Sequence, residues 1–177
     1  MENAKSLTKV INLYAGPGTG KSTTAAGLFY EMKLRGYDVE LVREYAKNFA
    51  YGYELPSQPY LFAKQLKAES QLYNKVDWII TDSPLYLSAV YGDPMIFASL
   101  VKGVSLVKQD FNFFLKRFKP YHQNGRYQNE VEARLLDDRI KVVLDMHHVP
   151  YTIVEEYDRF RVDRILNDLA LQGVTHG

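Results

Sequence analysis

The stretch YAGPGTGKSTT, residues 14–24, constrains the fold of this chain more than any other part of the sequence. From Ala15 to Ser22 it follows the pattern A-x-x-x-x-G-K-S, with glycines at positions 16, 18 and 20. Glycine has no Cβ, so the backbone N–H groups of such a loop can turn inward around a phosphate group. The apolar run KVINLY (residues 9–14) precedes the loop, and a helical pattern follows it. This strand, loop and helix together predict a Walker A P-loop that binds ATP or GTP.

Each residue of the predicted P-loop has an expected part in holding the nucleotide. Lys21 reaches the β- and γ-phosphates, the Ser22 hydroxyl is a ligand of Mg²⁺, and the following helix directs the positive end of its dipole at the anion. The expected nucleotide-binding residues are Gly16, Pro17, Gly18, Thr19, Gly20, Lys21, Ser22 and Thr23. A glycine-rich turn with a chance GKS is the alternative, but the complete spacing and the flanking strand and helix argue against it.

The remainder of the sequence alternates between strand and helix patterns. Strands are expected at residues 9–14, 38–42, 78–81, 110–117 and 151–156. Helices are expected at 22–36, from Pro59 onward, irregularly across 85–108 with interruptions at Gly92-Asp93-Pro94 and Gly103, at 130–146 and at 158–171. Such alternation predicts the α/β class, with helices on both faces of a parallel sheet. No repeat or linker divides the chain, so residues 1–177 are expected to form one domain.

The helix expected at residues 130–146 is amphipathic. Its apolar face is expected to carry Val131, Leu135, Ile140, Val143 and Leu144. Arg134 has i,i+4 spacing to Glu130 and to Asp138, which favours pairing within the helix over a catalytic role.

Composition excludes several classes of protein and of site. The chain has 177 residues, no cysteine and a formal net charge of +1. Without cysteine there are no disulfides, thiolate zinc sites or cysteine nucleophiles. The near-neutral charge predicts no general attraction to nucleic acid or membrane, so such a partner would need a local patch. The N-terminal MENAKSLTKV lacks the apolar core of a signal peptide, and no apolar run approaches membrane-spanning length, so a cytoplasmic location is expected.

Ligands of parallel α/β sheets bind beyond the carboxyl ends of the strands, where the residues that accompany the P-loop are expected. NKVD at residues 74–77 resembles the guanine-reading motif of GTPases, but it precedes the third strand, whereas that motif follows a late strand.

Asp82 ends the apolar run VDWIITD, where a carboxylate holds Mg²⁺ through water. ATPase motors usually have a glutamate next; Ser83 and Pro84 follow here, so no hydrolytic base is evident. A turn or cap role is the alternative for Asp82.

The segment REY, residues 43–45, follows the second strand and supplies the expected acceptor side. A carboxylate at this place can face the γ-phosphate and accept a proton from the acceptor hydroxyl. Glu44 is therefore the candidate base and Arg43 the candidate anchor of the acceptor, with an ordinary surface ion pair as the alternative. Nothing local separates Glu44 from Asp82 as the proton acceptor.

Aromatic residues are concentrated in and after REY. They are Tyr45, Phe49, Tyr51, Tyr53, Tyr60 and Phe62. Such side chains can stack on a base or a pyridine ring. Tyr45 is expected to contact the substrate, and half or more of the group are expected to belong to the core.

Residues 111–129 contain no acidic side chain and include a candidate lid at about 117–130. Its cations surround a turn that contains proline and glycine: Lys116, Arg117, Lys119 and Arg126. A mobile cationic loop opposite a P-loop can neutralise the transferred phosphoryl group and exclude water. Arg126 is accordingly expected to be catalytic, and Arg117 and Lys119 to contact the substrate. A solvated basic loop is the alternative.

With these residues together, the chain resembles the small P-loop kinases of nucleosides and nucleotides. More narrowly, it is similar to the family that includes the nicotinamide riboside kinase domain and the phage 5-hydroxymethyluracil DNA kinases. The segments that carry the resemblance are AGPGTGKST, REY, TDSPL and FLKRFKPYHQNGRYQNEVEARLLDDRI, so it covers nearly the whole chain. The resemblance implies ATP and Mg²⁺ as cofactors, a five-stranded parallel sheet in the order 2-3-1-4-5 and a lid after the fourth strand. Ala15 replaces the usual first glycine, which the broader family tolerates.

The sequence thus predicts a phosphotransferase that moves the γ-phosphoryl group of ATP to a hydroxyl of a nucleoside-like acceptor. The resemblance makes 5-hydroxymethyluracil in phage DNA the first specific expectation, with the host cytoplasm as location if the chain is phage-encoded. A free nucleoside, a nucleoside monophosphate or nicotinamide riboside is the alternative acceptor. A regulatory nucleotide-binding ATPase module is the alternative from another functional class. No membrane partner is expected, and the oligomeric state is left open.

Overall fold

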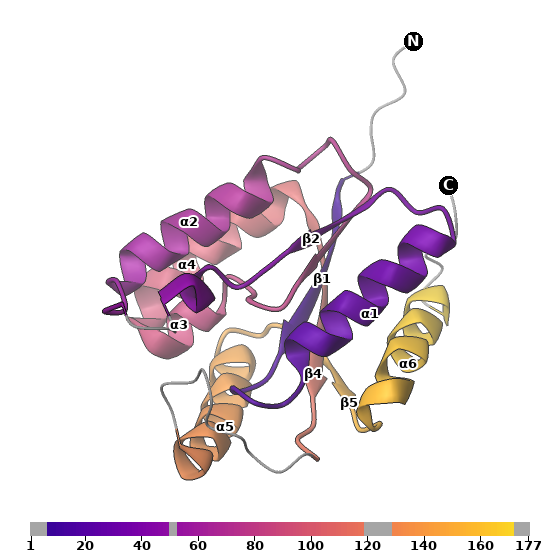
Figure 1. Cartoon of the computed structure of the whole chain (residues 1–177). Coiled ribbons are helices and arrows are strands. Elements are labelled where there is room, and N and C mark those ends of the chain that lie inside the picture. The colour runs from indigo at the N-terminus through magenta and orange to yellow at the C-terminus, as the bar shows by residue number, and fades with distance from the viewer. Residues whose placement is uncertain (1–6, 50–52, 119–128, 172–177) are drawn as a thin grey trace.

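The computed structural model describes residues 7–49, 53–118 and 129–171 of the chain (Figure 1). Five parallel strands form one sheet in the order β2-β3-β1-β4-β5. The strands are β1 Lys9–Tyr14, β2 Val39–Val42, β3 Trp78–Thr81, β4 Gln109–Leu115 and β5 Thr152–Val154. The α/β class and the strand order 2-3-1-4-5 are therefore confirmed.

Helices cover both faces of the sheet (Figure 1). On one face lie α1 Lys21–Leu34 and α6 Asp158–Leu171. On the other lie α2 Gln58–Ser70, α3 Leu87–Tyr91, α4 Pro94–Val104 and α5 Glu130–Met146. Two short 3-10 turns complete the described elements, η1 Tyr45–Phe49 and η2 Ser105–Val107. In the part of the chain that the structure describes, no helix has the length and apolar character needed to cross a bilayer.

The central strands are buried on both faces, as parallel strands between helix layers must be. Side chains alternate between the two faces along a strand. In β1, Ile11 and Leu13 pack with α1 and α6, whereas Tyr14 packs with Phe114 and the helices of the opposite layer. This double packing fixes the end of β1, from which the P-loop begins.

The irregular helical stretch expected at 85–108 is two helices separated by Gly92 and Asp93. Asp93 Oδ1 accepts hydrogen bonds from the backbone N–H groups of Met95 and Ile96, both at 2.9 Å, and Pro94 occupies the first turn of α4. These are a side-chain N-cap and a favourable proline position. Gly103 does not interrupt α4, which continues through it to Val104.

The bounds of α5 match the expected helix, but its expected apolar face is wrong at the first two turns. Val131 and Leu135 are 68% and 63% exposed, whereas Ala133 and Ile140 are fully buried. Leu135 and Ile140 are five residues apart, and at 3.6 residues per turn this spacing places them on different sides of a helix. The first half of α5 therefore packs through a small residue, and this allows close approach to the P-loop.

Candidate active site

The loop between β1 and α1 has the backbone of a phosphate cradle. Gly18 and Gly20 have φ values of 80° and 98°, in the left-handed region that favours glycine. Lys21 begins α1, and its Nζ donates hydrogen bonds to the carbonyl oxygens of Ala15 at 2.6 Å and Gly16 at 3.1 Å. The lysine therefore folds back over the loop, close to where a bound phosphate chain would lie.

The charge of Lys21 is poorly solvated. Desolvation by burial lowers the pKa of its ammonium group, and attraction to Glu44 and Asp82 opposes part of that shift. A desolvated cation gains more from an anionic partner than an exposed one does, because water screens it less. The P-loop thus presents an ammonium group suited to phosphate.

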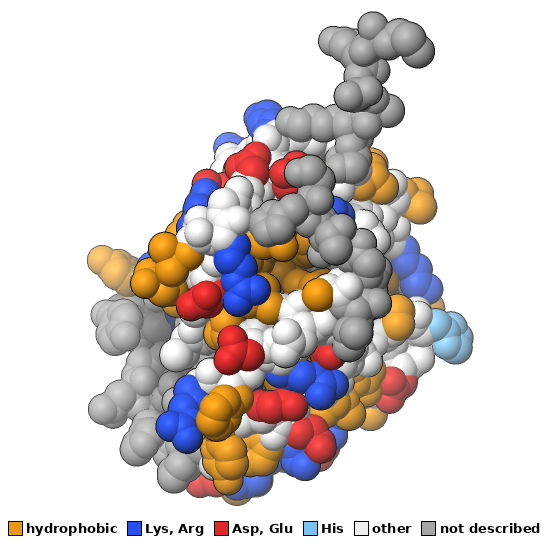
Figure 2. Space-filling view, turned by 90° about the vertical axis from the view of Figure 1, so that its right-hand side faces the viewer, with side chains coloured by type: hydrophobic (Ala, Val, Ile, Leu, Met, Phe, Trp, Pro, Cys, Tyr) orange, Lys and Arg blue, Asp and Glu red, His pale blue; other side chains and the backbone are white. Residues whose placement is uncertain are grey.

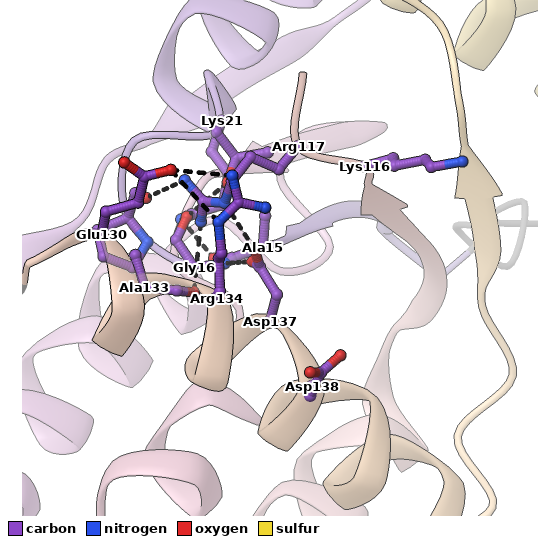
Figure 3. A network of polar contacts seen from close by, with 12 residues as sticks. Ala15, Gly16, Lys21, Lys116, Arg117, Glu130, Ala133, Arg134, Asp137 and Asp138 are labelled. Atoms are coloured by element: carbon purple, nitrogen blue, oxygen red, sulfur yellow. Dashed lines mark hydrogen bonds and ion pairs between the residues drawn. The ribbon is translucent and has the colours of Figure 1, made fainter. Parts of the chain in front are cut away.

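A carboxylate from α5 holds the first turn of the loop (Figure 3). Asp137 Oδ1 accepts a hydrogen bond from Gly16 N at 2.6 Å, and its Oδ2 accepts one from Arg117 Nε at 2.8 Å. Arg117 Nη1 in turn donates to the carbonyl of Pro17 at 2.9 Å. A Cβ on Gly16 would lie 2.6 Å from the carbonyl oxygen of Ala133, so only glycine fits against the helix. Asp137 and Arg117 together join β4, α5 and the P-loop.

The sequence interpretation did not single out Asp137. The available signal was its position, one helical turn after the buried Ala133 and one turn before Lys141 on a helix whose other inward residues are apolar. A carboxylate at an inward position of a helix requires a partner inside the protein.

The candidate lid residues divide between described and undescribed parts of the chain. The Arg117 side chain is 6% exposed and contacts Asp137, Pro17 and Ala133. Its expected contact with substrate stays a prediction. Lys119 and Arg126 lie outside the described residues. Arg134 pairs with Glu130 at 2.9 Å, which confirms the expected pairing within α5.

A second buried arginine fixes the far side of the P-loop. Arg161 of α6 has no exposed surface; its Nη1 donates to the carbonyl of Thr19 at 2.7 Å, and its Nη2 donates to the carbonyl of Lys116. Sequence reasoning missed it as well. Arg161 lies four residues before the buried Ile165, so helical spacing alone places this charge on the inward face of α6.

Three predicted site residues come together beside the P-loop around a lysine that the sequence interpretation did not consider. Lys47 Nζ donates a short hydrogen bond to Ser22 Oγ and lies 3.4 Å from Asp82 Oδ2 and 3.9 Å from Glu44 Oε2. Asp82 Oδ1 also accepts a hydrogen bond from the backbone N–H of Glu44 at 2.8 Å, and the Asp82 side chain is 3% exposed. The residues that follow β2 and β3 and the start of α1 thereby bring one hydroxyl and two carboxylates together around the ammonium group of Lys47.

The residues at this point fit Mg²⁺. A hydroxyl and two carboxylates already surround one cationic group, and such oxygen donors are the ligands that Mg²⁺ prefers. Among the described residues no three His, Cys, Asp or Glu side chains form a metal site by themselves. Magnesium in phosphate-binding sites is held by one or two protein groups plus phosphates and water, so Ser22 and Asp82 suffice as the protein part.

A cavity of about 980 Å³ extends from the P-loop across the ends of β2 and β3. Besides the P-loop it is lined by Arg43, Glu44, Tyr45, Ala46, Lys47, Asn48, Leu55, Pro56, Gln58, Leu61, Gln65, Ser83, Pro84, Leu87, Ser88 and Tyr91. Gln65 Oε1 accepts a hydrogen bond from Tyr45 N at 3.2 Å, and Gln65 Nε2 donates to Thr81 Oγ1 at 3.4 Å. Helix α2 therefore holds the segments after β2 and β3 against each other at the wall of the cavity.

The aromatic residues after β2 are less buried than expected. Of those the structure describes, Phe62 is in the core, Tyr53 and Tyr60 are 71% and 43% exposed, and Tyr45 and Phe49 are half-buried; Tyr51 lies outside the described residues. The rings of Tyr45 and Tyr60 lie 6.1 Å apart beside the cavity. The expectation of a mainly core role is wrong here, because these residues occupy a 3-10 turn, a loop and the outer side of α2 rather than a strand.

Sequence comparison places the chain in a known family. The family described as "AAA domain" matches residues 10–160. No curated protein matches the sequence.

Three similar solved structures share the architecture at low sequence identity. Deoxyadenosine kinase from M. mycoides, solved with dCMP and a flexible dCDP, has a TM-score of 0.60 at 15% identity, over 92% of this chain and 99% of that one. The YorR protein from Bacillus subtilis, solved with phosphorylated GDP, has a TM-score of 0.60 at 15% identity, over 95% and 99%. Thymidylate kinase from Ehrlichia chaffeensis has a TM-score of 0.61 at 14% identity, over 92% and 99%. At these identities the likeness establishes the fold.

Proposed function

The chain belongs to the family described as "AAA domain", and from this premise we propose that it is a kinase that transfers the γ-phosphoryl group of ATP to a hydroxyl of a nucleoside-like acceptor. One observation carries the proposal. Ser22, Asp82 and Glu44 come together around Lys47 beside the P-loop, at the wall of a cavity of about 980 Å³ that continues past the phosphate cradle. That cavity is at the upper end of the usual range for ligand sites, so it offers room for an acceptor next to a nucleotide.

Each residue has a proposed part in the transfer. Glu44 takes the proton of the acceptor hydroxyl while that oxygen bonds to the γ-phosphorus, and the bond from the γ-phosphorus to the bridging oxygen breaks. The electron pair stays on ADP, and Lys21 compensates the charge that develops on the phosphates. Mg²⁺, with Ser22 and Asp82 as its protein ligands, would supply further neutralisation of phosphate charge. Lys119 and Arg126 remain candidates for the lid.

The acceptor side supports a nucleoside-like molecule. Arg43 and Tyr45 line the same cavity as the P-loop and are the proposed substrate contacts. Two of the similar structures are kinases of a nucleoside and of a nucleotide, by their names, and this favours a small acceptor. On the face seen in Figure 2, acidic and basic side chains of the described residues are interspersed, so that face offers no continuous basic track to a DNA strand. 5-Hydroxymethyluracil in DNA is kept as one arm of the test.

The test is transfer of label from γ-³²P-ATP to a panel of nucleosides, nucleoside monophosphates, nicotinamide riboside and DNA that contains 5-hydroxymethyluracil. We expect the label to be transferred to at least one small acceptor faster than it is released as phosphate by hydrolysis. The variant Lys21→Ala should lose at least about a hundredfold in turnover, the usual effect of removing one group that stabilises transition-state charge. Lys33→Ala, on the surface of α1 and paired with Glu40, is the matched control and should keep its rate.

Two results would redirect the proposal. Release of labelled phosphate at the same rate with and without every acceptor would make the chain an ATPase module. Labelling of the DNA far above the free nucleosides, with the logarithm of affinity falling by about 0.7–0.9 per phosphate contact against the logarithm of salt concentration, would make DNA the acceptor.

A further inference from the structure

The ammonium group of Lys47 occupies the point where the metal ligands of the proposed kinase meet. Its hydrogen bond to Ser22 Oγ and its approach to Asp82 and Glu44 join three segments that are distant in the sequence. Both carboxylates and the hydroxyl direct oxygen atoms at the same nitrogen. A single cation therefore already offsets part of the negative charge of this group of oxygens.

An ordinary surface ion pair does not describe this contact. Asp82 is 3% exposed, while the Lys47 side chain is 40% exposed and lines the cavity. The lysine thus reaches from the rim of the cavity to a nearly buried carboxylate. Its flexible four-carbon stem starts from the short 3-10 turn η1, so the ammonium group can leave by rotation about side-chain bonds without any helix moving.

We propose that Lys47 is a displaceable counter-cation of the metal position, an inference that rests on the proposed kinase function. Ser22 Oγ cannot take the ammonium group and a divalent metal as close neighbours together, because the two cations repel each other. Binding of metal and nucleotide must therefore displace Lys47 from Ser22 and Asp82. Until then, Lys47 bridges the carboxylates of Glu44 and Asp82 and offsets part of their charge.

This competition has a measurable consequence. Two ligands that exclude each other from one site lower each other's apparent affinity by the same factor. Lys47 should accordingly raise the metal concentration needed to load the nucleotide site. Removing the charge of Lys47 should lower the metal concentration needed to load the nucleotide site. Metal binding should thus improve even though a residue that lines the site has been replaced.

The experiment is a titration of Mn²⁺, a spectroscopic substitute for Mg²⁺, at saturating ADP, followed by electron paramagnetic resonance. No phosphoryl transfer is needed for this readout. We expect Lys47→Met to lower the half-saturating Mn²⁺ concentration about tenfold, within the usual range for coupled sites. Lys64→Met is the matched control, because Lys64 lies over the rings of Tyr45 and Tyr60 rather than at Ser22, and should change the value less than twofold. Lys47→Gln replaces the first variant if that one does not fold.

Each other result decides against the inference. If the natural chain binds Mn²⁺ and ADP, and the Lys47 variants have an unchanged or a higher half-saturating concentration, the inference is overturned and the proposed kinase stands. An equal decrease in the Lys47 and Lys64 variants would assign the effect to general electrostatics and overturn it too. Failure of the natural chain to bind Mn²⁺ with ADP would remove the proposed function, and this inference with it.

Discussion

Both ends of the sheet hold a lysine between two carboxylates, in very different surroundings. At the carboxyl ends of the strands, Lys47 lies between Glu44 and Asp82, and its side chain is 40% exposed. At the amino ends, Lys108 lies between Glu69 and Asp110, and its side chain is 2% exposed. Lys47 and Glu44 of the first trio line a cavity, whereas the second trio is enclosed by packed helices and strands.

The enclosed trio is joined by hydrogen bonds, and Glu69 Oε1 is buried without a hydrogen-bond partner among the described residues. Lys108 Nζ donates to Asp110 Oδ1 at 2.7 Å and lies 3.5 Å from Glu69 Oε2, which also accepts from the Tyr73 hydroxyl at 3.1 Å. Burial raises the pKa of Glu69, and the charge of Lys108 opposes that shift. A lysine between two carboxylates therefore contributes to stability where it is buried. Where water and ligands reach it, the lysine can be displaced from its partners.

The largest expected effect separates the two ends by activity. Glu44→Gln should lower turnover by about 10²–10⁴-fold, the usual contribution of a general base. Asp82→Asn should also lower turnover and should raise the Mg²⁺ concentration for half-maximal rate, whereas Glu44→Gln should leave that concentration unchanged. Steady-state kinetics at varied Mg²⁺ measures both. The opposite metal dependence would exchange the roles of the two carboxylates.

The next effect separates the two ends by stability. Lys108→Met should lower the free energy of unfolding by about 3–5 kcal/mol, because it leaves the fully buried Glu69 without its cation. Lys47→Met, the matched change at the other end, should cost less than this, because Lys47 and Glu44 are partly exposed and Asp82 keeps its hydrogen bond from the backbone N–H of Glu44. Urea unfolding of both variants gives the comparison, and equal losses would contradict it.

The pH dependence of the same variant has a definite sign. Because the pKa of Glu69 is raised on folding, the folded state binds a proton more tightly than the unfolded state, and stability falls as pH rises from the unfolded pKa through the folded pKa. Without the charge of Lys108, the folded-state pKa of Glu69 should rise further, so the pH range over which stability falls should extend to higher pH. Lys108→Met should therefore regain stability as pH is lowered from 7 toward the ordinary pKa of a glutamate.

The smallest effect concerns the contact between α5 and the P-loop. Asp137→Ala should cost about 1–3 kcal/mol, because it leaves Gly16 N and Arg117 without their acceptor. The neighbouring Asp138→Ala removes a 72% exposed carboxylate that contacts Lys141, and it should cost much less. Urea unfolding distinguishes the two; a similar loss in both would mean that Asp137 contributes only general charge.

The sequence could predict those parts of the site that local pattern and topology determine. The P-loop is a continuous motif, and Glu44 and Asp82 each follow a strand, so a parallel sheet brings them to one edge. Their convergence with Ser22 followed from strand alternation alone. The strand order came from family resemblance rather than from the residues, because pairing between strands leaves no local signature.

What could not be predicted depends on side chains that meet across long stretches of sequence. Gly16 and Asp137 are 121 residues apart, and nothing in either segment specifies the other. The sequence interpretation did not consider Lys47, because the reach of its side chain toward Ser22 depends on how η1 is oriented. The contact of Arg117 with substrate stays a prediction, while its hydrogen bond to Asp137, 20 residues away, was not specified by either segment.

The buried bond from Arg161 to the carbonyl of Thr19 has a consequence for how the chain is made. The P-loop leaves the ribosome before two of its supports, because Asp137 lies 121 residues after Gly16 and Arg161 lies 142 residues after Thr19. At about 5–20 residues per second, translation separates them by on the order of ten seconds. A nascent chain thus carries a Walker A sequence before it can form the P-loop contacts described above, and nucleotide can stabilise that geometry only once Asp137 and Arg161 have emerged.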